Sequence, residues 1–442
     1  MRDHLLQAYR RLPLTPALKA RLRYGILRAI PWAFPAALRP GLNPVQARPA
    51  APLPDRSDWL VFGVIDWHLR LQRPQHLAIR LARAGHRVFY ISSNLVPASG
   101  PGFRVEPLEG TGRLFQIHLN AIGVAEIYLG LPGEATVRQL AGGLEALADW
   151  SEAQAPVLLV DHPFWTRVAK AFPADLLVYD RMDYHAGFVD WSASLEAEEE
   201  RLIRDADLTV ATSAWLAERT AAPQGSLALI RNAAEWGHFA VPPQTRFADP
   251  RYAKVIGYYG AISHWLDAEL VEAIARAFPD ALVLLIGHDQ AGLATRLAGL
   301  SNLSCVGEVP YAELPHYLYG FDVCLLPFRR LELTLATSPV KVYEYLAAGL
   351  PVVATELPEM AQFGDLVRTV DDPGAWVAAI CEALEEPADD PLRARRRAFA
   401  ASQTWDARAA ELMAAVEARR RSKGCRGVAQ DPSLGDNRLS SG

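Results

Sequence analysis

The chain has 442 residues, of which 50% are hydrophobic and 21% are charged, as is typical of a soluble globular protein with a large core. This length exceeds what one hydrophobic core usually serves, so we expect two domains of roughly 150–200 residues each. No run of 18 uncharged apolar residues occurs, which argues against a transmembrane helix. The four cysteines have neither metal-ligand spacing nor a disulfide framework, which favours a cytoplasmic protein with reduced thiols.

Residues 1–54 are predicted to form a basic leader followed by a Pro/Ala-rich linker. Residues 1–50 contain nine Lys or Arg and one acid, a charge of +8, whereas the whole chain carries −5, so the remainder carries −13. The apolar residues of the leader recur every four positions, at Leu18, Leu22, Ile26 and Ile30. An amphipathic basic helix of this kind can lie peripherally at the inner face of an anionic membrane. Docking on the protein's own surface is the alternative, and the residues leave both open.

A first series of strands and helices is predicted over residues 55–245. Apolar, β-branched runs predict buried parallel strands, and helical periodicity that ends at Gly85 predicts a helix between the first two of them. A strand, a helix and a strand over this length form a βαβ unit with a right-handed crossover. The predicted strands are WLVFGVI (59–65), HRVFYIS (86–92), RLFQIHL (113–119), PVLLVDH (156–162), LLVYDRM (176–182), LTVATS (208–213) and LALIRN (227–232).

A second series follows over residues 250–400, after the polar stretch RFADPRYA (246–253) that we interpret as the linker. Two tandem doubly wound, Rossmann-like domains, an α/β fold, follow from this pattern. A helix is expected at residues 390–419, and the polar, Gly/Ser-rich residues 421–442 are expected to be disordered. The predicted strands of the second series are KVIGYYGAI (254–262), ALVLLIG (281–287), LSCVG (303–307), VCLLPF (323–328) and PVVAT (351–355).

The two domains are expected to bind their ligands in the cleft between them. In open α/β sheets, ligands bind beyond the carboxyl ends of the strands, where helix N-termini point inward. Epimerases, dehydrogenases and periplasmic-type binding proteins also contain tandem Rossmann domains, so the fold alone does not decide the function.

Residues 337–355, TSPVKVYEYLAAGLPVVAT, form the most informative segment. Pro339 suits the first turn of a helix over residues 339–348, with Ser338 or Thr337 as a potential N-cap. The free N–H groups at this helix start and the nearby Lys341 ammonium suit a diphosphate. Glu344 follows on roughly the same face, where its carboxylate could accept hydrogen bonds from ribose hydroxyls. A capped helix with a surface Lys–Glu pair is the alternative explanation.

This segment closely resembles the donor-binding signature of GT-B glycosyltransferases in the family 4-like group, a P-x-K-x-x-E-Y-x-A-x-G-x-P-V-V pattern that holds the nucleotide sugar. The resemblance implies the GT-B fold, in which two Rossmann-like domains face each other across a cleft. It makes residues 55–245 the acceptor-binding domain, residues 250–400 the nucleotide-sugar-binding domain, and residues 401–420 a helix that crosses back to the first. Further segments resemble parts of the family's chain and follow one another in the family's order. They are residues 67–92, 176–188, 196–216, 230–239, 255–265, 306–328 and 404–417.

The resemblance also implies contacts to the donor. Glu344 would bind the ribose, and Lys341 with the Ser338 side of the helix start would bind the diphosphate. Gly260 would let the backbone approach a phosphate closely, although a simple turn glycine is an equal alternative. Val309 would flank the base, with a plain strand-to-helix loop as the alternative.

Acceptor-side candidates lie at strand ends of the first domain. Asp180 and Asp183 follow an apolar strand and should face the cleft, where a carboxylate could orient an acceptor hydroxyl or act as a catalytic base. A helix cap or a salt bridge is the alternative for both. His162 also ends a strand and is a third catalytic candidate, and Arg73 could bind the acceptor or a phosphate, or only hold its own loop.

The chain departs from the family pattern at two places. Many family 4 enzymes carry a second glutamate eight positions before the ribose glutamate, where this chain has Ala336, with Glu332 as the nearest acid. Many also carry Arg and Lys after the first strand of the donor domain, where this chain has Ser, His and Trp at residues 263–265. The diphosphate charge is therefore expected to be neutralised by Lys341 or by an arginine such as Arg329.

The resemblance implies an enzyme that moves a sugar from a UDP- or GDP-linked donor to a hydroxyl of a saccharide or lipid-linked acceptor, in cell-surface polysaccharide synthesis. We expect no cofactor and no metal, because a helix dipole and cations can take the place of a metal ion, and we expect retention at the anomeric carbon. A nucleotide-sugar 2-epimerase of the same fold and a catalytically silent GT-B domain that binds a partner are the alternatives. The acidic body opposes nucleic-acid binding.

Overall fold

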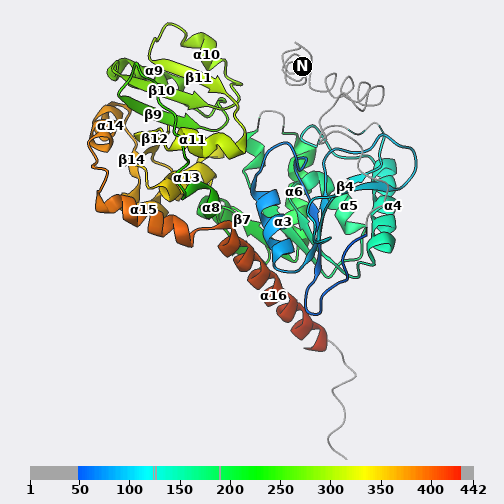
Figure 1. Cartoon of the computed structure of the whole chain (residues 1–442). Coiled ribbons are helices and arrows are strands. Elements are labelled where there is room, and N and C mark those ends of the chain that lie inside the picture. The colour runs from blue at the N-terminus through cyan, green and yellow to red at the C-terminus, as the bar shows by residue number, and fades with distance from the viewer. Residues whose placement is uncertain (1–47, 123, 125–126, 189–190, 430–442) are drawn as a thin grey trace, which may run out of the picture.

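The computed structural model describes residues 48–122, 124, 127–188 and 191–429. The predicted leader up to residue 47, and the part of the predicted tail beyond residue 429, lie outside the described residues. The described chain forms two α/β domains connected at two points, as Figure 1 shows.

The N-terminal domain is built on an eight-stranded sheet in the order β3-β4-β2-β1-β5-β6-β7-β8. Neighbouring strands are parallel, except for β3, which runs antiparallel to β4. Both faces of the central strands are buried, because α3 and α16 cover one face and α4, α5 and α6 cover the other, which explains why these strands are continuous apolar runs. The strands are β1 (Asp58–Phe62), β2 (Arg87–Ile91), β3 (Phe103–Pro107), β4 (Leu114–Leu119), β5 (Val157–Val160), β6 (Leu176–Arg181), β7 (Leu208–Ala211) and β8 (Leu227–Leu229). The helices are α3 (Arg73–Arg83), α4 (Glu134–Ser151), α5 (Thr166–Lys170), α6 (Ala193–Asp205) and α7 (Ala214–Glu218).

The C-terminal domain contains a six-stranded parallel sheet in the order β11-β10-β9-β12-β13-β14. Its order is that of a doubly wound fold, which reverses direction between β9 and β12. The strands are β9 (Lys254–Tyr259), β10 (Ala281–Ile286), β11 (Leu303–Gly307), β12 (Val323–Leu326), β13 (Val352–Thr355) and β14 (Arg368–Val370). The helices are α8 (Trp236–Phe239), α9 (Ala268–Ala277), α10 (Leu293–Arg296), α11 (Leu314–Leu318), α12 (Glu332–Leu335), α13 (Val340–Ala348), α14 (Trp376–Leu384) and α15 (Pro391–Ser402).

The structure differs from the sequence-based expectation mainly at edges and ends. The edge strands β3 and β14 were not predicted, because they are short and only partly buried and so lack a long apolar run. The single helix predicted at residues 390–419 is two helices, α15 and α16 (Trp405–Ala429), and the second continues into the stretch predicted to be disordered. The backbone of α16 is helical through residues 421–429 although their composition is polar, because helical hydrogen bonding can propagate along an established helix.

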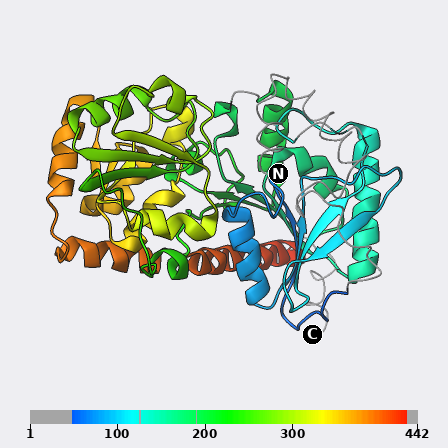
Figure 2. The ribbon, with the colours of Figure 1, turned by 45° about the horizontal axis from the view of Figure 1, so that its top comes forward.

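The chain crosses between the domains twice. The first crossing lies after β8, and Ala234 and Phe239 already pack in the C-terminal core, ahead of the linker expected at residues 246–253. The second crossing is at α16, whose residues Trp405 and Leu412 pack in the N-terminal core. Figure 2 shows α16 running from the C-terminal domain beneath the N-terminal sheet. In the part of the chain that the structure describes, no helix is long and apolar enough to span a membrane.

Candidate functional site

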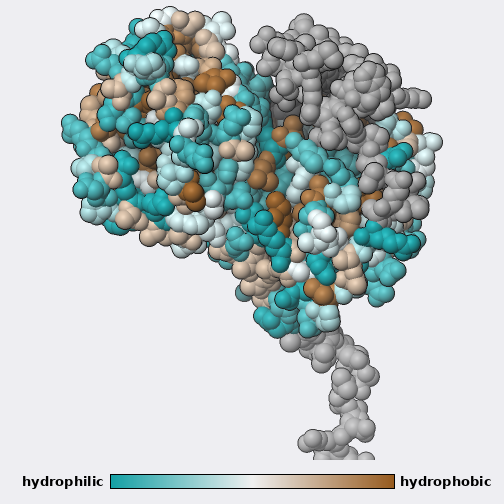
Figure 3. Space-filling view, viewed as in Figure 1, coloured by the Kyte–Doolittle hydropathy of each residue, from teal (hydrophilic) through white to brown (hydrophobic). Residues whose placement is uncertain are grey.

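The loops that follow the carboxyl ends of both sheets meet at the domain boundary. Arg70, after β1, donates two hydrogen bonds to the carboxylate of Glu308, after β11, at 2.6 and 3.1 Å. Gly187, in the 3-10 helix η5 (His185–Gly187) after β6, packs so closely on α12 that a Cβ there would lie 2.8 Å from Leu333 Cβ. Figure 3 shows hydrophobic side chains gathered along this boundary between the domains. The ligand-binding edges of both sheets therefore face each other.

Glu344 lies on α13 and turns toward the end of β9. Its side chain is buried and accepts a hydrogen bond of 2.8 Å from the Tyr259 hydroxyl. Burial disfavours the charged form and raises the pKa of Glu344 to about 7,. A carboxylate near neutral pKa with one hydrogen-bond partner can accept further bonds from ligand hydroxyls. Tyr259 was not among the predicted site residues, because its position at the end of an apolar strand gives no sign of this contact.

Lys341 lies one turn before Glu344, and its ammonium lies near two aromatic rings. Nζ lies 5.6 Å from the ring centroid of Tyr258 and 5.2 Å from that of Phe328. Burial lowers the pKa of Lys341 to about 8. Gly260, after β9, has a φ of +138°, and a Cβ there would lie 2.7 Å from Lys341 Cε. The structure therefore brings Gly260 and Lys341 together, with Glu344 on the same helix.

The start of α13 differs from the prediction. Its N-cap is Pro339, with no side-chain cap, so the helix begins at Val340 and neither Ser338 nor Thr337 caps it. The Ser338 hydroxyl instead accepts a bond from the Asn232 backbone N–H at 3.3 Å, and the Ser338 carbonyl accepts one from Asn232 Nδ2 at 2.7 Å. The extended ψ of 106° at Pro339 keeps Ser338 outside the helical turn. Ser338 therefore contributes directly to the contact between the domains.

Two other predicted donor residues lie at the rim of the C-terminal domain. Arg329 is partly exposed and pairs with Glu269 on α9. Val309 is half-buried and packs against the C-terminal core between β11 and the 3-10 helix η6 (Tyr311–Glu313). The structure gives neither residue a contact with Lys341 or Glu344.

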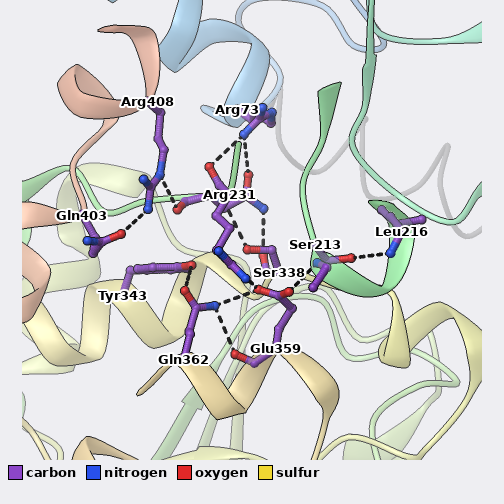
Figure 4. Close-up of polar contacts among 12 residues, drawn as sticks. Arg73, Ser213, Leu216, Arg231, Ser338, Tyr343, Glu359, Gln362, Gln403 and Arg408 are labelled. Atoms are coloured by element: carbon purple, nitrogen blue, oxygen red, sulfur yellow. Dashed lines mark hydrogen bonds and ion pairs between the residues drawn. The ribbon is translucent and has the colours of Figure 1, made fainter. Parts of the chain in front are cut away.

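Arg73 and Asp180 form a buried ion pair. Arg73 is the first residue of α3, and its Nε and Nη2 donate to the two carboxylate oxygens of Asp180 at 2.7 and 3.0 Å. Arg73 Nη1 also donates to the Arg231 carbonyl at 3.1 Å and to Asn232 Oδ1 at 3.3 Å, as Figure 4 shows in part. Because both oxygens of Asp180 accept from a guanidinium, Asp180 is poorly suited to act as a base. The pair joins β6 to the segment that crosses between the domains.

Asp183 has a different environment from Asp180. It is half-buried, and among the described residues it makes no ion pair or side-chain hydrogen bond that occupies its carboxylate. Burial raises its pKa, an effect that His185 opposes and Asp180 reinforces. A half-buried, unpaired carboxylate at a strand end can accept a hydrogen bond from a ligand hydroxyl.

His162 is buried with one ring nitrogen occupied. Its Nδ1 accepts a bond of 3.1 Å from the Phe164 N–H and so caps the 3-10 helix η4 (Pro163–Trp165). Because Nδ1 is the acceptor, the neutral ring carries its proton on Nε2, and burial lowers the pKa of His162 well below its ordinary value. Nε2 has no partner among the described residues. His162 is thus a neutral N–H donor and not a general base.

A buried acid holds the two domains together next to this site. Glu359, in the 3-10 helix η7 (Pro358–Leu366), accepts bonds from the Ala214 N–H at 2.6 Å, from Arg231 Nε at 2.8 Å and from Gln362 Nε2 at 2.8 Å. Ala214 is the first residue of α7 in the N-terminal domain, so Glu359 bonds to both domains, as Figure 4 shows. The sequence offered no periodic or motif signal for this contact.

The alanine at the position of the expected second glutamate also lies between the domains. Ala336 is fully buried in a small cluster with Ala211 and Leu216 of the N-terminal domain. A carboxylate there would lose its hydration without a partner. Glu332, one turn earlier, lies near Tyr184, whose pKa is raised by burial and then by this carboxylate.

Comparisons with known proteins agree with this geometry. Residues 253–386, which contain Gly260, Lys341 and Glu344, match the family model described as Glycosyl transferases group 1. The chain is 26% identical over 275 residues to TuaH of Bacillus subtilis (strain 168), which is named as a teichuronic acid biosynthesis glycosyltransferase; the match covers 57% of this chain and 69% of that protein.

The chain is a glycosyltransferase of the GT-B fold.

Further matches of this glycosyltransferase extend over both domains. It is 25% identical over 267 residues to a UDP-glucuronate:glycolipid 2-beta-glucuronosyltransferase of Xanthomonas campestris pv. campestris, covering 55% of this chain and 62% of that protein. A sucrose-phosphate synthase of Thermosynechococcus elongatus shares the fold with a TM-score of 0.65 at 17% identity, covering 82% of this chain and 98% of that one. HepE of Anabaena, solved with UDP and glucose, has a TM-score of 0.55 at 12% identity, covering 82% and 99%. At these identities the two structural matches establish the fold alone.

Metal ligands do not gather at this site. Among the residues that the structure describes, no group of three or more His, Cys, Asp or Glu side chains is arranged to hold a metal ion. The candidate polar groups lie on two domain edges, with Lys341 and Glu344 in the C-terminal domain and Asp183 and His162 in the N-terminal domain.

Proposed function

We propose that the glycosyltransferase moves a sugar from a UDP-linked donor to a hydroxyl of a saccharide or lipid-linked acceptor. The observation that carries the proposal is the contact of Gly260 with Lys341, one turn before the buried Glu344, at the domain edge that faces the N-terminal domain. A uridine nucleotide is favoured because the Xanthomonas relative is named for UDP-glucuronate and HepE was solved with UDP.

The donor site works by fixed positive charge and a fixed acceptor. The Lys341 ammonium and the free N–H groups at the start of α13 attract the diphosphate, and Gly260 leaves room for it beside Lys341. Glu344 accepts hydrogen bonds from the ribose hydroxyls. These preorganised groups stabilise the charge that develops on the leaving diphosphate, so we propose that transfer needs no metal ion, with no cofactor besides the nucleotide sugar.

The acceptor side orients a hydroxyl toward the anomeric carbon. Asp183 accepts a hydrogen bond from the acceptor hydroxyl, and His162 Nε2 donates one to a sugar oxygen. Arg73 and Asp180 act as positioning residues, because their ion pair connects the end of β6 to the crossing segment. We propose retention at the anomeric carbon, in which the proton of the acceptor hydroxyl passes to the departing phosphate oxygen; the anomeric coupling constant of the product measures this outcome.

The cellular role that we propose is synthesis of a cell-surface polysaccharide at the inner face of the membrane. The relatives named for teichuronic acid biosynthesis and for a glycolipid acceptor support it. The net charge of +8 on residues 1–50 would favour contact with anionic lipid,.

Calorimetric titration tests the donor site. Purified protein in EDTA should bind UDP more tightly than GDP or ADP, and Glu344→Ala should weaken UDP by about tenfold or more, because two charge-assisted hydrogen bonds to the ribose are lost. Glu200→Ala, at an exposed position of α6, is the control and should leave UDP affinity unchanged. Tight UDP binding by Glu344→Ala, or binding that requires added Mg²⁺, would contradict the proposed donor site.

A further inference from the structure

Aromatic rings from three loops of the N-terminal domain converge beyond the carboxyl ends of β4, β5 and β6. His185 and Trp191 stack with a centroid distance of 5.0 Å and an interplanar angle of 11°. His162 meets the edges of Tyr128, His185 and Trp191 at 5.0, 5.2 and 5.7 Å. We call this set the ring cluster; its members are Tyr128, His162, His185, Phe188 and Trp191.

The ring cluster contains polar atoms without partners. His162 Nε2 and Trp191 Nε1 are buried N–H donors, and neither has an acceptor among the described residues. Both carboxylate oxygens of Asp161, the neighbour of His162, likewise have no donor there, although the residue is fully buried. An unpaired buried polar group costs about 1–3 kcal/mol, and native proteins keep few of them. The unpaired N–H groups of His162 and Trp191 belong to two rings in contact, with centroids 5.7 Å apart, and together they indicate a place for a polar ligand.

Hydrogen bonds within the N-terminal domain account for the burial of His185 but not for that of His162. His185 Nδ1 lies 3.2 Å from Glu199 Oε1, which also accepts from Tyr179 and Arg181. His185 is therefore a satisfied core histidine. His162 has no comparable partner at Nε2 in the described part of the chain, so its burial alone does not account for it.

The ring cluster lies next to the proposed reaction centre. Burial and then the carboxylates of Asp183 and Asp161 raise the pKa of Tyr128, which shows that both acids are close to its phenol. Val160 pairs with Tyr179 in the β5–β6 ladder, so Asp161 and Asp180 follow side by side. On its other side the η5 turn packs on Leu333 of the donor domain. A ligand at the ring cluster would thus reach Asp183 from the N-terminal domain.

We propose that the ring cluster is the subsite for the acceptor's sugar ring, and that this sugar is a neutral pyranose. This rests on the proposed glycosyltransfer. The negative face of an aromatic ring attracts the weakly positive C–H groups on the apolar face of a pyranose, and the two unpaired N–H groups donate to its oxygens.

The charges select against a uronate at this subsite. Burial raises the pKa of Asp161 well above its ordinary value and also raises that of Asp183, so neither acid favours its charged form and neither could pair with a uronate,. An acidic sugar would lose its hydration here without gaining a counter-ion. The arginines at the end of β6 and the start of α3 offer no compensation, because Arg181 pairs with Glu199 and Arg73 pairs with Asp180. A neutral sugar, in contrast, supplies hydroxyl groups that can hydrogen-bond to either form of these two acids.

Saturation-transfer NMR on the full chain with saturating UDP tests the subsite. The probes are the methyl glycosides of glucose, galactose, mannose and N-acetylglucosamine, with glucuronic acid as the acidic comparison. At least one neutral glycoside should receive saturation at its ring C–H protons, and glucuronic acid should receive little. Trp191→Ala should abolish the transfer, and Trp191→Phe, which keeps a ring but lacks the N–H, should weaken binding about fivefold, the effect of one neutral hydrogen bond.

Two controls separate this proposal from the donor site. Trp215→Phe changes another half-buried tryptophan of the same domain and should leave the glycoside signal unchanged. Every variant should keep wild-type UDP affinity, which shows that the chain is folded and the donor site intact. If UDP binds but no neutral glycoside gives a signal that depends on Trp191, or if glucuronic acid binds best, the subsite proposal is wrong and the donor site stands. If wild-type protein binds no UDP, the proposed function fails first, and a Trp191-dependent glycoside signal would then still support a sugar site.

Discussion

Burial shifts the pKa values of two side chains on one turn of α13, Lys341 and Glu344, in opposite directions toward neutrality. Burial disfavours the charged form of both, which lowers the pKa of the lysine to about 8 and raises that of the glutamate to about 7,. Ligand groups of opposite character should reverse these shifts, because a diphosphate stabilises the ammonium and ribose hydroxyls stabilise the carboxylate. The site is therefore expected to exchange protons when it binds a nucleotide.

UDP binding should take up protons at pH 8.5. At this pH Lys341 is mostly neutral in the free protein, and a bound diphosphate raises its pKa. A fraction of a proton is therefore taken up with the ligand. For the same reason the affinity for UDP falls as the pH rises from 7 to 9. Calorimetry in two buffers of different ionisation enthalpy measures the uptake. Lys341→Met is the matched variant and should show none; equal uptake by this variant would place the titrating group elsewhere.

Gly260 should tolerate no side chain. Its φ of +138° is unfavourable for alanine, and the added Cβ would lie 2.7 Å from Lys341 Cε,. Gly260→Ala should therefore displace the lysine and weaken UDP binding by about tenfold or more. Gly237→Ala on α8, where an added Cβ would meet no described atom within 4 Å, should bind UDP as the wild type does. A similar loss of affinity in both variants would contradict this explanation.

Among the secondary-structure elements, α13 and η7 depend on the N-terminal domain for their polar partners. Ser338, just before α13, bonds to Asn232, and Glu359 in η7 bonds to Ala214 and Arg231. Each of these contacts joins residues that are more than 100 positions apart in the chain. These bonds, with the Arg70–Glu308 pair, connect the two domain edges.

Glu359→Ala should lower the free energy of unfolding by about 2–3 kcal/mol, because it leaves Arg231 and the first N–H of α7 without their acceptor. Urea denaturation measures the change. Glu359→Gln should lose less, since its amide oxygen still accepts a bond, and Glu200→Ala, in an exposed pair with Arg204, should change stability by less than about 0.5 kcal/mol. A loss for Glu359→Ala no larger than that of Glu200→Ala would show that the contact is dispensable.

At the level of the whole chain, the charge of residues 1–50 is opposite in sign to that of the remainder. Deletion of residues 1–50 should abolish binding to liposomes that contain anionic lipid, while UDP affinity stays unchanged. Cosedimentation at two salt concentrations measures this, and binding by the full chain should weaken at the higher one. Unchanged liposome binding after the deletion would rule out the leader as the membrane contact.

Much of the fold could be predicted from the sequence, because parallel strands buried on both faces are continuous apolar runs and their helices end at glycines. β1 and β13 were found within a few residues of their observed ends. The placement of Lys341 and Glu344 on one helix was also visible, because residues three apart lie on the same face.

Partners that are distant in the chain could be identified only in three dimensions. Asp180 looked like a candidate base until Arg73, on α3, was found bonded to both its oxygens. Ser338 looked like a cap until the crossing segment was found to bond it. Local periodicity and propensity depend on neighbours within one or two turns, so they were enough to predict the two domains and the signature of α13. Which side chains remain free to meet a ligand depends on long-range packing, and for that reason the folded chain alone separates Asp183 and His162 Nε2 from their paired neighbours.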